Sequence, residues 1–150
     1  MLRLSKLADY ATVLMTAVAT APDRVHTGVE LAERTHIPAP TVAKLLKTLT
    51  RGGLLDSLRG AHGGYRLARS PERISVADVI GALEGPISVT DCATHGGGCT
   101  IERDCAARAN WRLINSAIRQ ALEAVTLAQM ATTPVRHAEY PLNFHPTATR

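Results

Sequence analysis

Apolar residues recur every three or four positions along the first half of the chain, a spacing typical of amphipathic helices. Residues 4–20 carry one such stripe, which ends at the turn-forming residues 21–23. Thr27 and Glu30 have the spacing of a capping box, so a short second helix is expected there. Pro40 suits the first turn of a third helix, because its missing N–H would be unpaired there in any case. The apolar face of this third helix consists of Val42, Leu45, Leu46 and Leu49.

Two short apolar runs, at residues 54–58 and 65–68, follow the glycine pair at 52–53 and predict a β-hairpin. The tip between them, residues 59–64, contains three glycines, which permit backbone conformations of positive φ. This tip is longer than a minimal two-residue turn, which favours a function over an incidental turn. Three helices followed by a hairpin are the order of a winged helix-turn-helix.

The second half of the chain changes character twice. Ser75 and Asp78 are expected to begin a short helix that ends at Gly85-Pro86, and residues 86–105 then have no apolar period. Helical spacing returns from about residue 106 to residue 128. One seam of this long helix is apolar and suits pairing with another helix. The seam consists of Trp111, Ile114, Ile118, Ala121 and Val125.

The composition favours a globular partner of duplex DNA. The 17 lysines and arginines against 13 aspartates and glutamates give a net charge of +4, which favours a polyanion. The chain has only one Phe, one Trp and three Tyr, too few aromatic side chains to favour binding of single strands by base stacking. No apolar run is long enough for a membrane span or a signal peptide, so we expect a cytoplasmic protein without a membrane partner. Serine-hydrolase, zinc-protease, P-loop and Rossmann motifs are lacking, so neither an enzymatic activity nor a small-molecule substrate is expected.

These patterns together predict a mainly α protein, a winged helix-turn-helix with a small β-hairpin wing and a long C-terminal dimerisation helix. Residues 1–85 are expected to form the DNA-binding domain and residues 86–105 a cysteine-bearing loop. Residues 106–130 are expected to form the dimerisation helix. Residues 131–150 contain three prolines and no apolar period, which predicts a flexible tail.

The outward side of the third helix and the hairpin tip hold the candidate DNA-binding residues. Thr41 and Lys44 are placed to reach base edges in the major groove, and Lys47 and Arg51 to contact phosphates. Arg59 can reach a groove, while backbone N–H groups of the tip can approach phosphates. The other tip residues assigned to this role are Gly60, His62, Gly63 and Gly64. The alternative is a solvated helix face and a plain turn.

All three cysteines lie within 14 residues of the predicted loop, as Cys92, Cys99 and Cys105. Soft thiolates select iron–sulfur clusters, zinc or copper(I), and the short cysteine pairs of zinc sites are absent, so an iron–sulfur cluster fits better. The alternative is three unrelated cysteines. A fourth ligand would have to come from elsewhere. Local candidates are His95, Asp91, Glu102 and Asp104, and Asp9 near the edge of the first apolar stripe is a weaker one.

Several segments together are similar to the Rrf2 family of winged-helix regulators, which includes iron–sulfur and nitric-oxide regulators. The similar segments are residues 3–6, 31–34 with 37–38, the hairpin at 59–69, residues 74–80 and the cysteine loop. The resemblance covers about residues 1–130. It implies a homodimer crossed through the C-terminal helix, with each cluster held by Cys92, Cys99 and Cys105.

The resemblance also bears on the fourth ligand and on the target. Some members use a histidine three residues after the last cysteine, where this chain has Arg108. This difference excludes the histidine ligand. Nitric-oxide-sensing members use an aspartate of the partner's first helix, and the matching residue is Asp9. The alternative is a labile site with three protein ligands. Residues 83–87 and 108–111 most resemble regulators of the SUF iron–sulfur assembly operon. The expected function is therefore a repressor of that operon, which binds a double-stranded operator and senses a [2Fe–2S] or [4Fe–4S] cluster. The alternatives are a nitric-oxide or iron-responsive repressor of the same family, or a DNA-binding protein with a zinc site or thiol switch.

Overall fold

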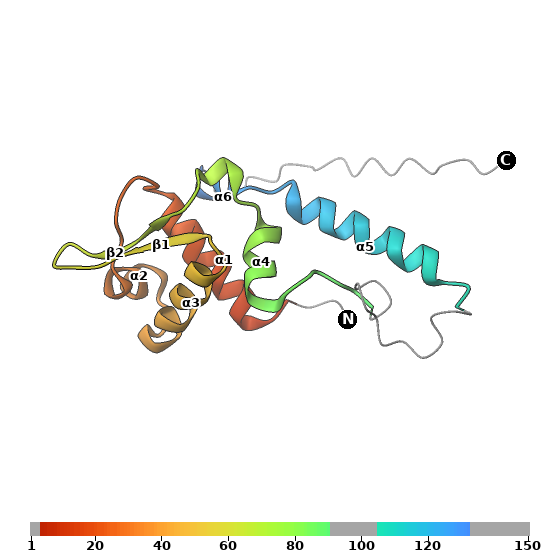
Figure 1. Cartoon of the computed structure of the whole chain (residues 1–150), viewed down its shortest axis with the longest axis horizontal. Coiled ribbons are helices and arrows are strands. Elements are labelled where there is room, and N and C mark those ends of the chain that lie inside the picture. The colour runs from red at the N-terminus through yellow and green to blue at the C-terminus, as the bar shows by residue number, and fades with distance from the viewer. Residues whose placement is uncertain (1–3, 91–104, 133–150) are drawn as a thin grey trace.

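Three helices packed around a common core are followed by a two-stranded hairpin, in a computed structural model that describes residues 4–90 and 105–132 (Figure 1). The helices are α1 (Lys6–Ala19), α2 (Gly28–Thr35) and α3 (Ala39–Arg51), and the hairpin joins β1 (Leu55–Leu58) to β2 (Gly64–Leu67). The 3-10 turn η1 (Pro71–Arg73) and helix α4 (Val76–Glu84) come next. Beyond the cysteine region lie α5 (Arg108–Glu123) and α6 (Leu127–Thr132).

The helix starts are stabilised by side chains that accept hydrogen bonds from otherwise unpaired backbone N–H groups. Ser5 caps α1 in this way, and Ser75 and Asp78 form the complete capping box predicted for α4. At α2 only half of the predicted box forms. Thr27 accepts a bond from the N–H of Glu30, but the Glu30 carboxylate instead pairs with Arg24 at 3.1 Å. The capping box prediction for this helix was therefore only half right.

The core lies between α1 and the helix-turn-helix. The apolar stripe of α1 is fully buried at Leu14, Met15 and Val18, and it meets the predicted apolar face of α3. Burial of this kind stabilises by roughly 1.5–3 kcal/mol for each large apolar side chain. The same spacing that forms the core also determines which side of α3 remains in solvent. The α3 residues that are buried are Val42, Leu45, Leu46 and Leu49.

The hairpin extends from the helical body toward one end of the molecule (Figure 1). Its two strands pair antiparallel from Leu55 opposite Leu67 to Leu58 opposite Gly64. A third segment joins them, because His26 forms a bridge with Tyr65 on the outer side of β2. The hairpin is thereby fixed to the connection between α1 and α2.

The long C-terminal helix is interrupted where the sequence pattern predicts continuity. It ends at Glu123, because the carbonyl of Val125 accepts a hydrogen bond from Val76 and the N–H of Leu127 donates one to Ile74. Thr126 then caps α6 by exchanging bonds with Gln129. The expectation of one helix from 106 to 128 was therefore wrong, and Val125 does not continue the seam of α5.

The two parts of the C-terminal region are packed very differently. Helix α6 lies against α1 and η1, with Leu127 fully buried in the main core. Helix α5 has no buried residue and extends away from the body on the side opposite the hairpin (Figure 1). Most of the predicted tail, from residue 133 on, lies outside the described residues, as do residues 91–104 of the predicted loop. Of the helices in the described ranges, none has the length and apolar character needed to cross a membrane.

Candidate nucleic-acid interface and cysteine segment

Helix α3 presents a basic face because its apolar face is used by the core. Lys44, Lys47 and Arg51 are exposed, and Thr41 near the start of the helix is half-buried. Arg51 lies in the last turn, where a cation also interacts favourably with the helix dipole. The structure therefore places the predicted residues of α3 on its solvent side, with Thr41 at the edge of the packed surface.

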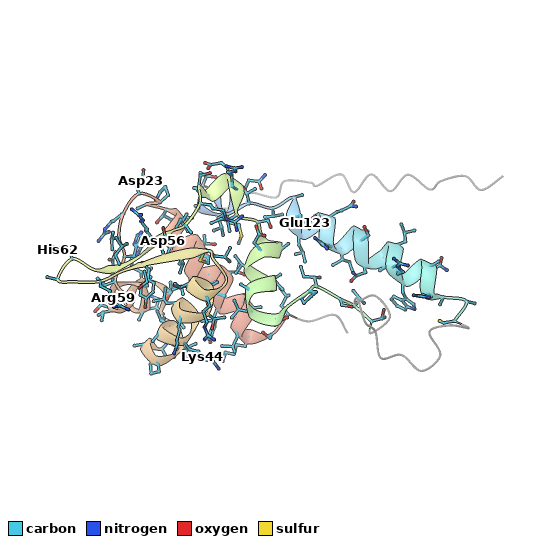
Figure 2. All side chains as sticks on the ribbon, viewed as in Figure 1. Asp23, Lys44, Asp56, Arg59, His62 and Glu123 are labelled. Carbon is cyan, nitrogen blue, oxygen red and sulfur yellow. The ribbon has the colours of Figure 1, made fainter. Side chains whose placement is uncertain are left out.

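The end of the hairpin carries the second group of predicted residues. Arg59, Gly60 and His62 are exposed, and Figure 2 shows Arg59 and His62 at the far end of the hairpin, separate from Lys44 on α3. On the strands themselves, Asp56 pairs with Arg66 at 3.6 Å, which offsets one positive charge there. The two predicted DNA-binding groups thus come from two elements of the same half of the molecule.

The glycines of the tip have a structural reason of their own. Gly60 has φ +105°, a conformation that L side chains rarely adopt. A Cβ on Gly63 would lie 2.4 Å from the carbonyl oxygen of Leu58, and one on Gly64 would lie 2.5 Å from that of His26. The hairpin needs these glycines whether or not it contacts DNA. Their predicted role at phosphates remains a prediction.

Of the predicted metal ligands, the structure describes two. Cys105 is half-buried with a free thiol, and its carbonyl accepts a hydrogen bond from the N–H of Arg108 at the start of α5. Asp9 is exposed in the first turn of α1, where a carboxylate also interacts favourably with the helix dipole. Within residues 4–90 and 105–132 no three His, Cys, Asp or Glu side chains are grouped as a metal site. Outside the described residues lie Cys92, Cys99, Asp91, His95, Glu102 and Asp104.

Both described ends of the cysteine segment are attached to α5. At the N-terminal end, the N–H of Val89 donates to the Asn115 side chain at 3.1 Å. At the other end, Cys105 lies three residues before α5, and its carbonyl accepts the bond from the first residue of that helix, Arg108. Nearby lies a cavity of about 390 Å³, whose apolar lining includes Leu4, Ile80, Ile87, Ile118 and Leu122. The segment therefore begins and ends on one helix.

Two residues of this architecture were missed by the sequence analysis. Asn115 follows Ile114 but lies off the apolar seam, and no local motif connects it with Val89. His26 was one of six scattered histidines, yet it is the one buried polar or charged residue among those described. The Thr27 cap next to it indicated a helix start, which gives no sign that His26 itself is buried.

A trihelical unit with α3 exposed, followed by a hairpin, defines a winged helix-turn-helix protein. Residues 4–133 match the family described as "Rrf2: Iron-dependent Transcriptional regulator". The chain belongs to the Rrf2 family of transcriptional regulators. This confirms the predicted fold class, the family resemblance and the expectation of a DNA-binding regulator rather than an enzyme.

The relatives include regulators with different names. The chain is 31% identical over 131 residues to the HTH-type transcriptional regulator IscR of Aliivibrio salmonicida, covering 86% of this chain and 77% of that one. It is 28% identical over 149 residues to protein rrf2 of Nitratidesulfovibrio vulgaris, covering 99% of each. Among solved structures, it is similar to CymR, the global cysteine regulator of B. subtilis, with a TM-score of 0.69 and 28% identity. That match covers 87% of this chain and 97% of CymR.

Proposed function

We propose that this protein is a cytoplasmic, homodimeric repressor that depends on an iron–sulfur cluster and binds a double-stranded operator of the SUF iron–sulfur assembly operon. The observation that carries the proposal is the attachment of both ends of the cysteine segment to α5, a helix whose C-terminal connection is hydrogen-bonded to the DNA-binding body through Val125 and Leu127. The family description, which names an iron-dependent transcriptional regulator, supports it.

The donor set fits such a cluster. Three thiolates in one segment are the preferred ligands of iron–sulfur centres. Asn115, which holds Val89, lies seven residues or about 10 Å of helix from Arg108. The three residues from Val89 to Cys92 reach at most about 11 Å. Cys105 lies in the turn just before Arg108, to which its carbonyl is bonded. The chain length therefore allows Cys92 and Cys105 to serve one centre, with Cys99 between them in the sequence.

The connection to DNA binding runs through the described residues. A bound cluster would supply iron–thiolate bonds that oxidation, nitric oxide or loss of iron can break. Val89 and Cys105 hold the ends of the segment on α5, and the backbone bonds of Val125 and Leu127 join that helix to α4 and η1. A change in the order of the segment can therefore change how α5 is held, and with it the spacing of the two DNA-binding units of a dimer.

Anaerobic purification tests this function directly. We expect a coloured protein with iron and sulfide in equal amounts, whose holo form protects an operator that the apo form protects less. Footprints of both forms on one operator, isolated by genomic footprinting, provide the comparison. Stoichiometric zinc in a colourless protein would identify the zinc alternative, and equal protection by both forms would leave the cluster without a regulatory role there. Exposure of the holo form to nitric oxide or to an iron chelator distinguishes the sensing alternatives.

Arg59→Ala should lower affinity for the operator about tenfold, with a much smaller loss on a scrambled duplex, because a bidentate contact to a base edge discriminates sequence. Lys47→Gln is the matched control, since a phosphate contact should weaken binding to both duplexes and lower the salt slope by about 1. Fluorescence anisotropy with both duplexes over a salt series measures this difference. Equal losses on both duplexes for Arg59→Ala would assign Arg59 to the phosphates instead.

Asp9→Ala should shorten the lifetime of the cluster in air, because Asp9 of one protomer completes the site of the other. Asp23→Ala, an exposed acid beyond the other end of α1, is the control. Mixed dimers separate the two possible arrangements. A protomer with Asp9→Ala paired with one carrying Cys105→Ser retains one complete site only if Asp9 acts across the dimer. Mixed dimers without a stable cluster would contradict the cross-subunit assignment.

A further inference from the structure

His26 is completely buried, although it lies on the short connection between α1 and α2. Buried polar side chains are stable only when their polar atoms have hydrogen-bond partners. The backbone of His26 pairs with β2, donating to the carbonyl of Tyr65 and accepting from its N–H, both at 2.8 Å. His26 thus acts as a third, one-residue strand beside the half of β2 that is nearer the hairpin tip.

The imidazole of His26 contacts α2 and the turn that follows α1. Its Nε2 lies 3.1 Å from the carbonyl oxygen of Ala21, which can only accept, so Nε2 carries the hydrogen. In the neutral ring Nδ1 then accepts, and it faces Nη1 of Arg34 on α2 at 3.4 Å. One ring therefore joins the turn after α1 to α2.

Arg34 extends this connection. Its Nη2 donates to the carbonyl of Ala17 at 3.1 Å and to the hydroxyl of Thr20 at 2.9 Å, both at the end of α1. Glu30 lies between two arginines, 3.1 Å from Arg24 and 3.6 Å from Arg34, and 3.7 Å from Nδ1 of His26. The network balances charge around the buried ring and leaves it little freedom to rotate.

We infer that His26 is a positioning residue, which fixes the angle between the wing and the helix-turn-helix and so determines where Arg59 meets the operator. The inference rests on the proposed role of the wing in DNA binding. Its basis is that a single buried residue holds β2 by its backbone, and by its ring holds α2 and the turn after α1. Helix α3 packs on both α1 and α2.

The geometry makes operator binding sensitive to this angle. Arg59 lies two residues beyond the level of Tyr65 on the paired strand, which is about 7 Å along the hairpin. A tilt of about 15° about the His26–Tyr65 pair would move the backbone of Arg59 by about 2 Å. Protein hydrogen bonds tolerate only a few tenths of an ångström, so such a tilt would break a direct contact.

A double-mutant cycle between His26 and Arg59 tests the inference in the full-length protein. We expect His26→Leu to lower operator affinity about as much as Arg59→Ala does. In a protein that already carries Arg59→Ala, adding His26→Leu should lower operator affinity by less than about twofold. His26→Gln should restore most of the affinity, because its amide can donate to Ala21 and accept from Arg34. Leu127→Ala, a buried change in α6, is the control for general destabilisation, and its loss should be independent of Arg59.

Hydrogen exchange of the DNA-free protein gives a second measurement that does not depend on the operator. The amides of His26 and Tyr65 should exchange at least tenfold faster in His26→Leu, while that of Leu46 in α3 should not change. Additive losses in the cycle, or unchanged exchange at both amides, would overturn the inference. If Arg59→Ala itself has no effect on binding, it is the proposed function of the wing that fails. If His26→Leu does not fold, Arg34→Met takes its place in both experiments. This variant removes the partner of Nδ1 at a side chain that is partly exposed.

Discussion

Replacing Ile114 by aspartate should convert the protein to a monomer that has lost most of its affinity for a palindromic operator. Ile114 and Trp111 are 43% and 38% exposed on α5, a helix that buries none of its own residues within one chain. A second copy of α5 would cover this seam, and a charge placed there would remain unpaired in the interface. Two half-sites that bind as a unit gain roughly 10²- to 10⁴-fold in affinity, so most of that factor should be lost.

The measurement for this variant is sedimentation at the concentrations used for DNA binding, together with operator affinity. Ser116→Asp is the matched control, because Ser116 is exposed on the same helix and lies off the seam. Ile118 is less suited to the test, since it lines the cavity between α4 and α5 within one chain. A wild-type protein that sediments as a monomer while bound to its operator would rule out the proposed dimer.

Replacing any one of the three cysteines by alanine should abolish stable cluster binding. Two remaining thiolates leave iron with open coordination positions, and even changes beyond the direct ligands of a metal cost 10- to 100-fold in affinity. We therefore expect Cys92→Ala, Cys99→Ala and Cys105→Ala to lose the cluster at least about tenfold faster than the wild type after anaerobic reconstitution. The decay of the visible absorbance, with iron and sulfide contents, provides the measurement.

Ser88→Ala is the control for a general disturbance of the cysteine segment, because the Ser88 hydroxyl donates to the carbonyl of Thr90 at the start of the segment and a hydroxyl is not a preferred ligand of iron–sulfur clusters. It should retain the wild-type cluster lifetime. One cysteine variant with an unchanged lifetime would remove that residue from the ligand set. Unchanged lifetimes for all three would contradict the cluster proposal as a whole.

The elements of the N-terminal half could be predicted because their signals are local. The apolar spacing of α1 and α3 determines both the core and the exposed face, so Lys44 and Lys47 were correctly expected in solvent. The break after Glu123 depends instead on Val76, a partner almost 50 residues away in the sequence, which no helical period reveals. A local signal for α6 was nevertheless present, since Thr126 and Gln129 have capping-box spacing.

The candidate site was predictable to a different degree in its two parts. The helix-turn-helix pattern predicts which residues of α3 and of the wing face solvent. Which of them contact bases and which contact phosphates depends on the DNA itself. The burial of His26 depends on Tyr65, which joins it only after the chain has formed the hairpin. For the metal site, Cys92 and Cys99 lie outside the described residues, and Asp9 is assigned to a second protomer. The ligand set therefore remains a prediction.

The return of α6 to the first helix has a consequence for the order in which the chain can fold. Leu127 belongs to the same core as Leu14 and Leu31, so this core has contacts that span more than 110 residues. The last of its side chains is synthesised after α5 and after all three cysteines. During synthesis, the core therefore cannot reach its final packing until the whole cysteine segment has been made. The cysteine segment is synthesised while the core is still incomplete.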